Sequence, residues 1–152
     1  MFKRLLKVLS KAATISVDDV MIAVASNKFL QQDIIYFNTV DQLFNKGINA
    51  EGESLEVVRG IGYAFDTIKD KIRKGLPYDR ITLYDTGKFY SSFRIQLIGT
   101  TLFIVAETVK GDTDLIDEFG PDIIGLTPEN KEKILVLARI ITKEYILTYL
   151  LK

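Results

Sequence analysis

The strongest hydrophobic pattern lies near the C-terminal end of the chain. Thr127 and Pro128, with an acid behind them, are typical of a helix start in which Thr is the N-cap and Pro takes the first position. Apolar residues then recur with a helical period: Ile134, Leu137, Ala138, Ile141, Tyr145 and Tyr149. Four more widen this stripe: Leu135, Ile140, Ile146 and Leu150. The pattern predicts a long C-terminal helix that is buried on more than one side.

The first dozen residues predict another amphipathic helix. Its apolar residues lie near helical spacing: Leu5, Leu6, Leu9 and Ala13. Its charged residues are all basic: Lys3, Arg4, Lys7 and Lys11. We expect residues 1–15 to form a basic N-terminal helix that packs on its own domain or serves as an interaction arm for a neighbour. Binding to a membrane surface is the less favoured alternative.

Two further helices are expected before residue 47. Ser16 is a good N-cap because two acids follow it, where the positive helix end favours carboxylates. The apolar face of this helix would comprise Val20, Val24, Phe29 and Ile34. Thr39 and Gln42 have the spacing of a capping box, which predicts a fresh helix that ends at Gly47. Residues 34–37 between them also suit a strand, because they are β-branched or aromatic.

The middle of the chain alternates between turns and short elements. A helix is expected over 63–74, ended by Gly75 with Pro77 just beyond it. Residues 80–84 are expected to form a strand, and residues 114–119 a single helical turn.

The clearest strand pattern follows residue 92. Residues 93–98 alternate between apolar and polar positions, Gly99-Thr100 is a turn, and residues 101–107 return. This predicts an antiparallel hairpin. We therefore expect an α+β fold, with helices around a small antiparallel sheet, in a single domain that covers residues 1–152.

Composition excludes many kinds of chemistry. The 152 residues include 20 Lys+Arg and 20 Asp+Glu, and 47% are hydrophobic, which favours one compact domain over disorder. The chain has no Cys and no His. Disulfides, thiolate metal sites, Cys nucleophiles and imidazole chemistry are therefore excluded, and we expect no cofactor or metal. With no apparent targeting segment or membrane span, we expect a soluble protein made in a cytoplasm.

One short motif suggests catalysis. Asp85-Thr86-Gly87 after an apolar segment is the signature of aspartic proteases, in which two copies of the aspartate share a proton. Lys88 and the aromatic residues behind it would crowd that catalytic floor, and such proteases are nearly all strand. We favour a structural turn, with Asp85 as a cap, Thr86 bonded to nearby backbone and Gly87 supplying an unusual dihedral angle.

Two charged clusters stand out near the turn. One is basic: Lys69, Lys71, Arg73, Lys74 and Arg80. The other is acidic: Asp112, Asp114, Asp117 and Glu118. The acidic cluster lacks the spacing of a calcium loop. The basic cluster, with Tyr63, Phe65 and Tyr78 around it, leaves contact with nucleic acid as an alternative. We expect the two clusters to lie on opposite faces and to dock copies of the subunit side by side.

Three segments together resemble a known family. Residues 75–93 contain Thr86-Gly87 followed by an apolar residue and a Ser, leading into the hairpin. In this they resemble the neck or tail-completion proteins of tailed phages, which are head–tail joining, minor-tail-protein-Z-like proteins. Residues 41–53 and 119–127 are similar to segments that flank this motif in small virion proteins of crAss-like Bacteroides phages.

The resemblance implies a non-enzymatic structural virion protein. It would form a homo-oligomeric ring in the phage neck, the head–tail connector between portal and tail, and would contact the portal or other neck and tail proteins. DNA passing through the ring would make only non-specific contacts. No membrane partner is expected, and the assembled location is the virion, after synthesis in the host cytoplasm. A nucleic-acid-binding module is the alternative function, and a retroviral-type aspartic protease is the least favoured.

Overall fold

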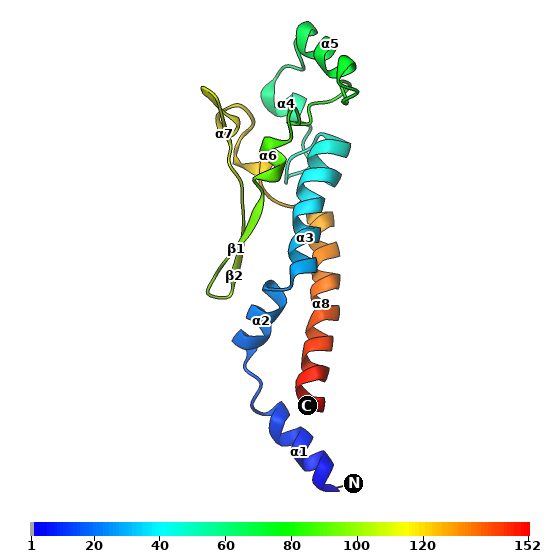
Figure 1. Cartoon of the computed structure of the whole chain (residues 1–152), viewed down its shortest axis with the longest axis vertical. Coiled ribbons are helices and arrows are strands. Elements are labelled where there is room, and N and C mark those ends of the chain that lie inside the picture. The colour runs from blue at the N-terminus through cyan, green and yellow to red at the C-terminus, as the bar shows by residue number, and fades with distance from the viewer. Residues whose placement is uncertain (1) are drawn as a thin grey trace.

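The computed structural model describes residues 2–152 and is elongated (Figure 1). Its helices are α1 (Phe2–Ala12), α2 (Val17–Ala25), α3 (Lys28–Tyr36), the π-helix η1 (Phe37–Lys46), α4 (Leu55–Arg59), α5 (Phe65–Arg73), α6 (Lys88–Ser91), α7 (Leu115–Phe119), the 3₁₀-helix η2 (Pro121–Ile123) and α8 (Pro128–Leu151). Its strands are β1 (Arg94–Ile98), β2 (Thr101–Val105), β3 (Val109–Lys110) and β4 (Thr113–Asp114). The predicted α+β class is confirmed.

The molecule has a head, a stem and a foot. Residues 48–93 and 106–127 form the head, at the top of Figure 1. The stem consists of α3, η1 and most of α8, with the β1–β2 hairpin alongside. The foot is α1, α2 and the last turns of α8, residues 143–151, at the lower end. None of the helices in residues 2–152 combines the length and the apolar character needed to cross a membrane.

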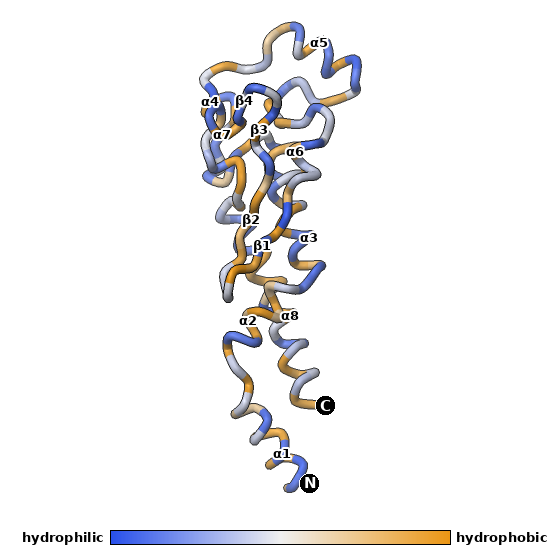
Figure 2. The backbone as a smooth tube through the Cα atoms, turned by 60° about the vertical axis from the view of Figure 1, so that its left-hand side comes forward, coloured by the Kyte–Doolittle hydropathy of each residue, from blue (hydrophilic) through white to orange (hydrophobic). Residues whose placement is uncertain are grey.

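Helix α8 begins as predicted, since the Thr127 hydroxyl accepts a hydrogen bond from the Asn130 N–H and Pro128 occupies the first turn. The predicted inner stripe is also confirmed. Ile134, Leu137, Ala138 and Ile141 pack against a core cluster that contains Leu30, Ile34 and Leu126. Burial on more than one side is wrong: Leu135, Val136, Ile140 and Leu147 are about half exposed, because α2, α3 and the hairpin cover one side of α8. Figure 2 shows hydrophobic positions recurring along α8 toward its C-terminal end.

The segment before residue 47 differs from the prediction. Ser16 caps α2 as expected, but this helix ends at Ala25, and Asn27 caps a new helix by accepting from the Leu30 N–H at 3.1 Å. Residues 34–37 are helical, and no fresh helix starts at Thr39. The helix instead continues as η1, and the buried Thr39 hydroxyl donates to the Ile35 carbonyl at 2.7 Å.

Buried amide side chains explain why the capping box does not form. Asn38 donates to the Ile123 carbonyl and accepts from the Gly125 N–H, at 3.1 and 2.8 Å. The Gln42 side chain donates to the Gly125 carbonyl at 3.0 Å and accepts from the Thr127 N–H at 2.9 Å. These bonds satisfy polar groups that would be costly to bury unpaired. They fasten η1 to residues 123–127, so two of the three segments that carry the family resemblance form one structural unit.

The hairpin is confirmed, with β1 and β2 antiparallel, Arg94 opposite Val105 and Ile98 opposite Thr101. The helix expected over 63–74 is observed as α5, and the turn expected over 114–119 as α7. The strand expected over 80–84 is wrong, because these residues run outside both two-stranded sheets of the described chain. Ile81 lies instead in the core of the head with Leu43, Leu55, Phe89, Phe93, Phe119 and Ile123.

Candidate functional site

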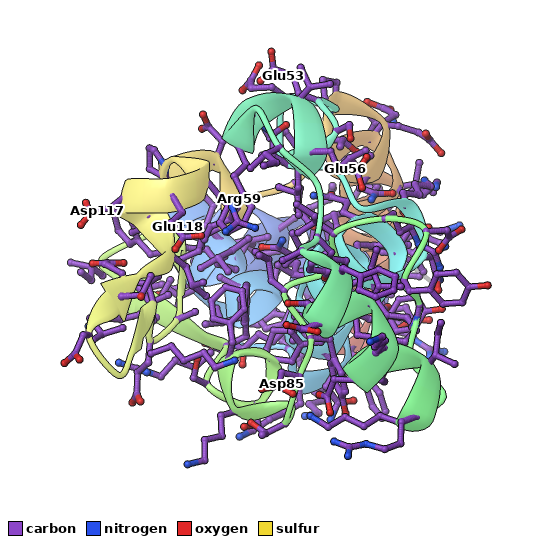
Figure 3. The ribbon with its side chains drawn as sticks, turned by 90° about the horizontal axis from the view of Figure 1, so that it is seen from above. Glu53, Glu56, Arg59, Asp85, Asp117 and Glu118 are labelled. Carbon is purple, nitrogen blue, oxygen red and sulfur yellow. The ribbon has the colours of Figure 1, made fainter. Side chains whose placement is uncertain are left out.

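A cleft of about 820 Å³ opens in the head. Its walls come from α5, from residues 81–89, from residues 107–111 and from α7. Both charged clusters and the Asp85-Thr86-Gly87 turn contribute to it. Figure 3 looks down on this end of the molecule and shows Asp85 on one side, with Arg59, Asp117 and Glu118 on the other. Of the sequence-predicted site residues, the cleft is lined by the Asp85-Thr86-Gly87 turn, Lys71 and Glu118; the other members of the two charged clusters are not part of its lining.

Along residues 81–85, the backbone forms hydrogen bonds with side chains instead of with a neighbouring strand. The buried Thr82 donates its N–H to the Tyr63 hydroxyl at 2.9 Å, and its carbonyl accepts from the Tyr90 hydroxyl. The next residue, Leu83, has a φ of +56°, a conformation that costs a non-glycine residue about 1–3 kcal/mol. A ladder of strand hydrogen bonds would not accommodate that angle. This explains why an apolar, β-branched segment fails to become a strand.

Lys71 is part of this support and does not lie on an outer face, so its assignment to a subunit interface is corrected. The residue is only 5% exposed. Its ammonium group donates to the Tyr84 carbonyl at 2.8 Å and lies 4.7 Å from the centre of the Tyr63 ring. The sequence around Lys71 is a run of cations, which gives little indication that this one is buried. The one indication is that Lys71 follows the half-buried Ile68 by three residues, which places both on the inner side of α5.

Asp85 does not cap the turn. Its two carboxylate oxygens contact Lys74 at 2.7 Å and Lys110 at 3.0 Å. Hydrogen bonds from these lysines lower the pKa of Asp85 to about 2, and the bond from Lys74 has the largest effect. An aspartic protease needs its aspartate pair to share a proton near its working pH. A carboxylate held ionised by two cations does not suit that role, so this geometry weighs against the protease hypothesis.

The rest of the turn matches the structural interpretation more closely. Gly87 has a φ of +81° and precedes α6, and a Cβ at this position would lie 3.1 Å from the Tyr84 hydroxyl. The Thr86 hydroxyl lies 3.5 Å from the Lys88 N–H, which is at the outer limit of a hydrogen bond.

The remaining cations of the basic cluster have partners close by. Arg73 pairs with Asp70, Lys74 with Asp70 at 2.7 Å as well as with Asp85, and Arg80 with Asp79 at 2.7 Å. The pairing raises the pKa of Lys74 and lowers that of Asp70, mainly through the hydrogen bond between them. Lys69 lies 4.4 Å from the centre of the Phe65 ring. Little of the basic cluster's charge is therefore left for a partner.

The acidic cluster is also partly used inside the chain. Asp114 caps α7 by accepting from the Ile116 N–H, and Glu118 pairs with Arg59 at 3.4 Å. Asp112 and Asp117 are exposed. Each cluster contributes one residue to the cleft, Lys71 from the basic cluster and Glu118 from the acidic one. That the exposed members of the two clusters lie on opposite faces stays a prediction.

Several charged side chains of the cleft are joined in ion pairs: Asp85 with Lys74 and Lys110, Asp70 with Lys74, and Glu118 with Arg59. Within residues 2–152, no three or more Asp or Glu side chains converge in a way that could hold a metal ion. Comparisons with protein-family models, curated proteins and solved structures found no match. The family resemblance of the sequence therefore stays a prediction.

A second candidate surface is the foot, and it is apolar. Helix α1 has no buried residue. The four large side chains of its apolar face are more than half exposed: Phe2, Leu5, Leu6 and Leu9. Nearby, α2 exposes Val17, Met21 and Ile22, and α8 exposes Leu147 and Leu151. Exposed apolar groups gathered at one end of a molecule mark an interaction surface.

Proposed function

We propose that this chain is a structural virion protein that forms a homo-oligomeric ring in the phage neck, between portal and tail. Two independent lines support the proposal. One is the resemblance of residues 41–53, 75–93 and 119–127 to neck and tail-completion proteins. The other is the distribution of apolar surface over an elongated subunit.

The observation that carries the proposal is the uncovered apolar surface of the foot and of the outer side of α8. Leu135, Val136, Ile140 and Leu147 follow one another along α8 with side chains about half exposed. Fully burying an exposed side chain of this size contributes about 1.5–3 kcal/mol, so covering one that is half exposed contributes about half of that. Subunits standing side by side in a ring would cover these residues through a head-to-tail interface that closes by rotation.

The charges of the head favour this role over the alternatives. A nucleic-acid-binding module needs cations that are free to replace counterions on phosphates. Here Arg73, Lys74 and Arg80 already contact carboxylates, and Lys71 is buried. The head as a whole holds 13 acidic against 8 basic residues, and this excess of negative charge also disfavours binding to a polyanion.

Electron microscopy of the purified full-length protein, alone and mixed with the portal of its phage, tests the proposal. We expect the protein alone to form closed rings of one uniform diameter, and we expect these rings to be attached to the portal in the mixture. A protein that stays monomeric under both conditions and is missing from the necks of intact particles would contradict the proposed function.

A further inference from the structure

Helix α1 has an apolar face that the described chain leaves largely exposed. Its apolar side chains lie three or four residues apart on one face, and its cations lie on the other. None of its residues is buried, and its neighbour in the fold is the end of α8, where the Thr14 and Tyr149 hydroxyls lie 3.1 Å apart. Isolated helices of fewer than about 12–15 residues are marginal in water, so α1 needs a surface to lie on.

We infer that α1 is an arm that docks on the foot of a second copy of this chain, against its α2 and the end of its α8. The inference rests on the proposed function, since it names the contact through which neighbouring subunits of the ring hold one another. It also replaces the two charged clusters of the head, which are occupied internally, as the source of two unlike faces.

Charge is the first argument for a second copy. Helix α1 holds four of the chain's 20 basic residues and none of its 20 acidic ones, so the remainder carries 16 basic against 20 acidic residues. Most of this acidic excess lies in the head, so the carboxylates that can attract the arm at the foot are Asp18 and Asp19 of α2. Complementary charge of this kind steers association and sets its register.

The second argument is that α2 offers a surface of matching chemistry. Asp18 and Asp19 lie in its first turn, and Val17–Ala25 contains no basic residue. Met21 and Ile22 are exposed beside Asp18, at 45% and 41%. The leucines of an incoming α1 can cover these two side chains, while a lysine at the edge of the arm extends toward Asp18.

The third argument is position. Helix α1, α2 and the last turns of α8 all lie at the same end of the molecule, as Figures 1 and 2 show. In both views α1 lies below α2, so the arm of one subunit must turn upward to meet the α2 of a subunit standing beside it. The contact is heterologous, because the arm of one copy meets the α2 of the next, and such contacts generate rings when the rotation closes.

Complementation between two full-length variants tests the inference. The arm variant is Leu5→Ser/Leu9→Ser, and the acceptor variant is Met21→Ser/Ile22→Ser. Each change should weaken self-association roughly 100-fold, because two apolar side chains lose their cover. Mixed together, the variants should form one-to-one dimers that grow no further, since each pair retains one intact arm and one intact acceptor. Sedimentation velocity measures the mass, and circular dichroism checks that each variant is folded.

Val57→Ser/Ile61→Ser is the control, because it replaces two apolar side chains that are even more exposed, at 76% and 67%, but lie in the head. This control should assemble like the unmodified chain. A mixture that stays monomeric, or an arm variant that assembles normally, overturns the docking of α1. In the second case rings still form, so the proposed function survives without the arm.

Vesicles of phosphatidylcholine with phosphatidylglycerol separate a lipid surface from a second copy. If the unmodified chain binds these vesicles through α1 and does not associate with itself, the inference is wrong and the arm contacts a membrane. Absence of the protein from particle necks would instead contradict the proposed function.

Discussion

Replacing the buried ammonium group of Lys71 by a thioether is the sharpest test of how the head is held together. Lys71→Met keeps the unbranched side chain up to the position of Cε and removes the ammonium group with its charge and its donors. The Tyr84 carbonyl then loses its 2.8 Å hydrogen bond, and an unsatisfied partly buried acceptor costs about 1–3 kcal/mol. The contact with the Tyr63 ring contributes a further ~0.5–1 kcal/mol.

Part of this cost is offset, because the variant no longer holds a charge away from water. We therefore expect a net loss of about 2 kcal/mol in the free energy of unfolding. Urea titration followed by circular dichroism measures it. The melting temperature should fall as well, by ~2–4 °C for each kcal/mol in a chain of this size.

Lys69→Met is the control, since Lys69 lies two residues away on the same helix and is exposed. Exposed substitutions usually change stability by less than about 0.5 kcal/mol. If Lys71→Met costs no more than this control, residues 81–85 do not depend on the ammonium group, and the account of the cleft is wrong. The same reasoning shows why a charge reversal at Lys71 cannot probe subunit contacts: it would disrupt the fold itself.

Two more substitutions test the other polar contacts. Asp85→Asn should lower stability by up to about 1 kcal/mol at pH 6, because its pairs with Lys74 and Lys110 are partly exposed. The folded-state pKa of Asp85 is lowered to about 2, so its contribution is present above about pH 4 and is lost as the pH falls through 2, where the variant and the unmodified chain should converge in urea titrations. Gln42→Leu should cost about 2–4 kcal/mol, because the buried Thr127 N–H and the Gly125 carbonyl lose their partner; a loss below about 1 kcal/mol in thermal unfolding would contradict a structural role for the amide network.

Local rules were enough to predict the helix starts and the hairpin. Ser16, Asp114 and Thr127 are N-caps whose side chains bond backbone groups two or three residues away, so the determining interactions lie within the local sequence. The hairpin is likewise set by alternation and a two-residue turn. These features need no knowledge of distant partners.

One missed feature is local, since the Asn27 side chain caps α3 by accepting from the Leu30 N–H three residues on. The other features that sequence reasoning missed depend on partners farther along the chain. Thr39 and Gln42 have capping-box spacing, but Gln42 bonds backbone groups more than 80 residues away and stays inside a continuous helix. Residues 80–84 look like a strand, yet Tyr63, Lys71 and Tyr90 satisfy their polar groups. Lys71 was placed by charge alone, which carries no information on burial, and Asp85 was assigned as a turn cap from the Asp-Thr-Gly motif, whereas it pairs with Lys74 and Lys110.

Paired charges in the head and exposed apolar side chains in the foot together indicate where the subunit contacts a partner. In the head, Asp70, Asp85 and Glu118 are paired with cations at distances of 2.7 to 3.4 Å, so a partner that binds these carboxylates must first break contacts. In the foot, the apolar face of α1 gives up nothing but water when it is covered. Association therefore gains more free energy at the foot than in the cleft, although the cleft is the larger cavity and holds the residues that look most like a site.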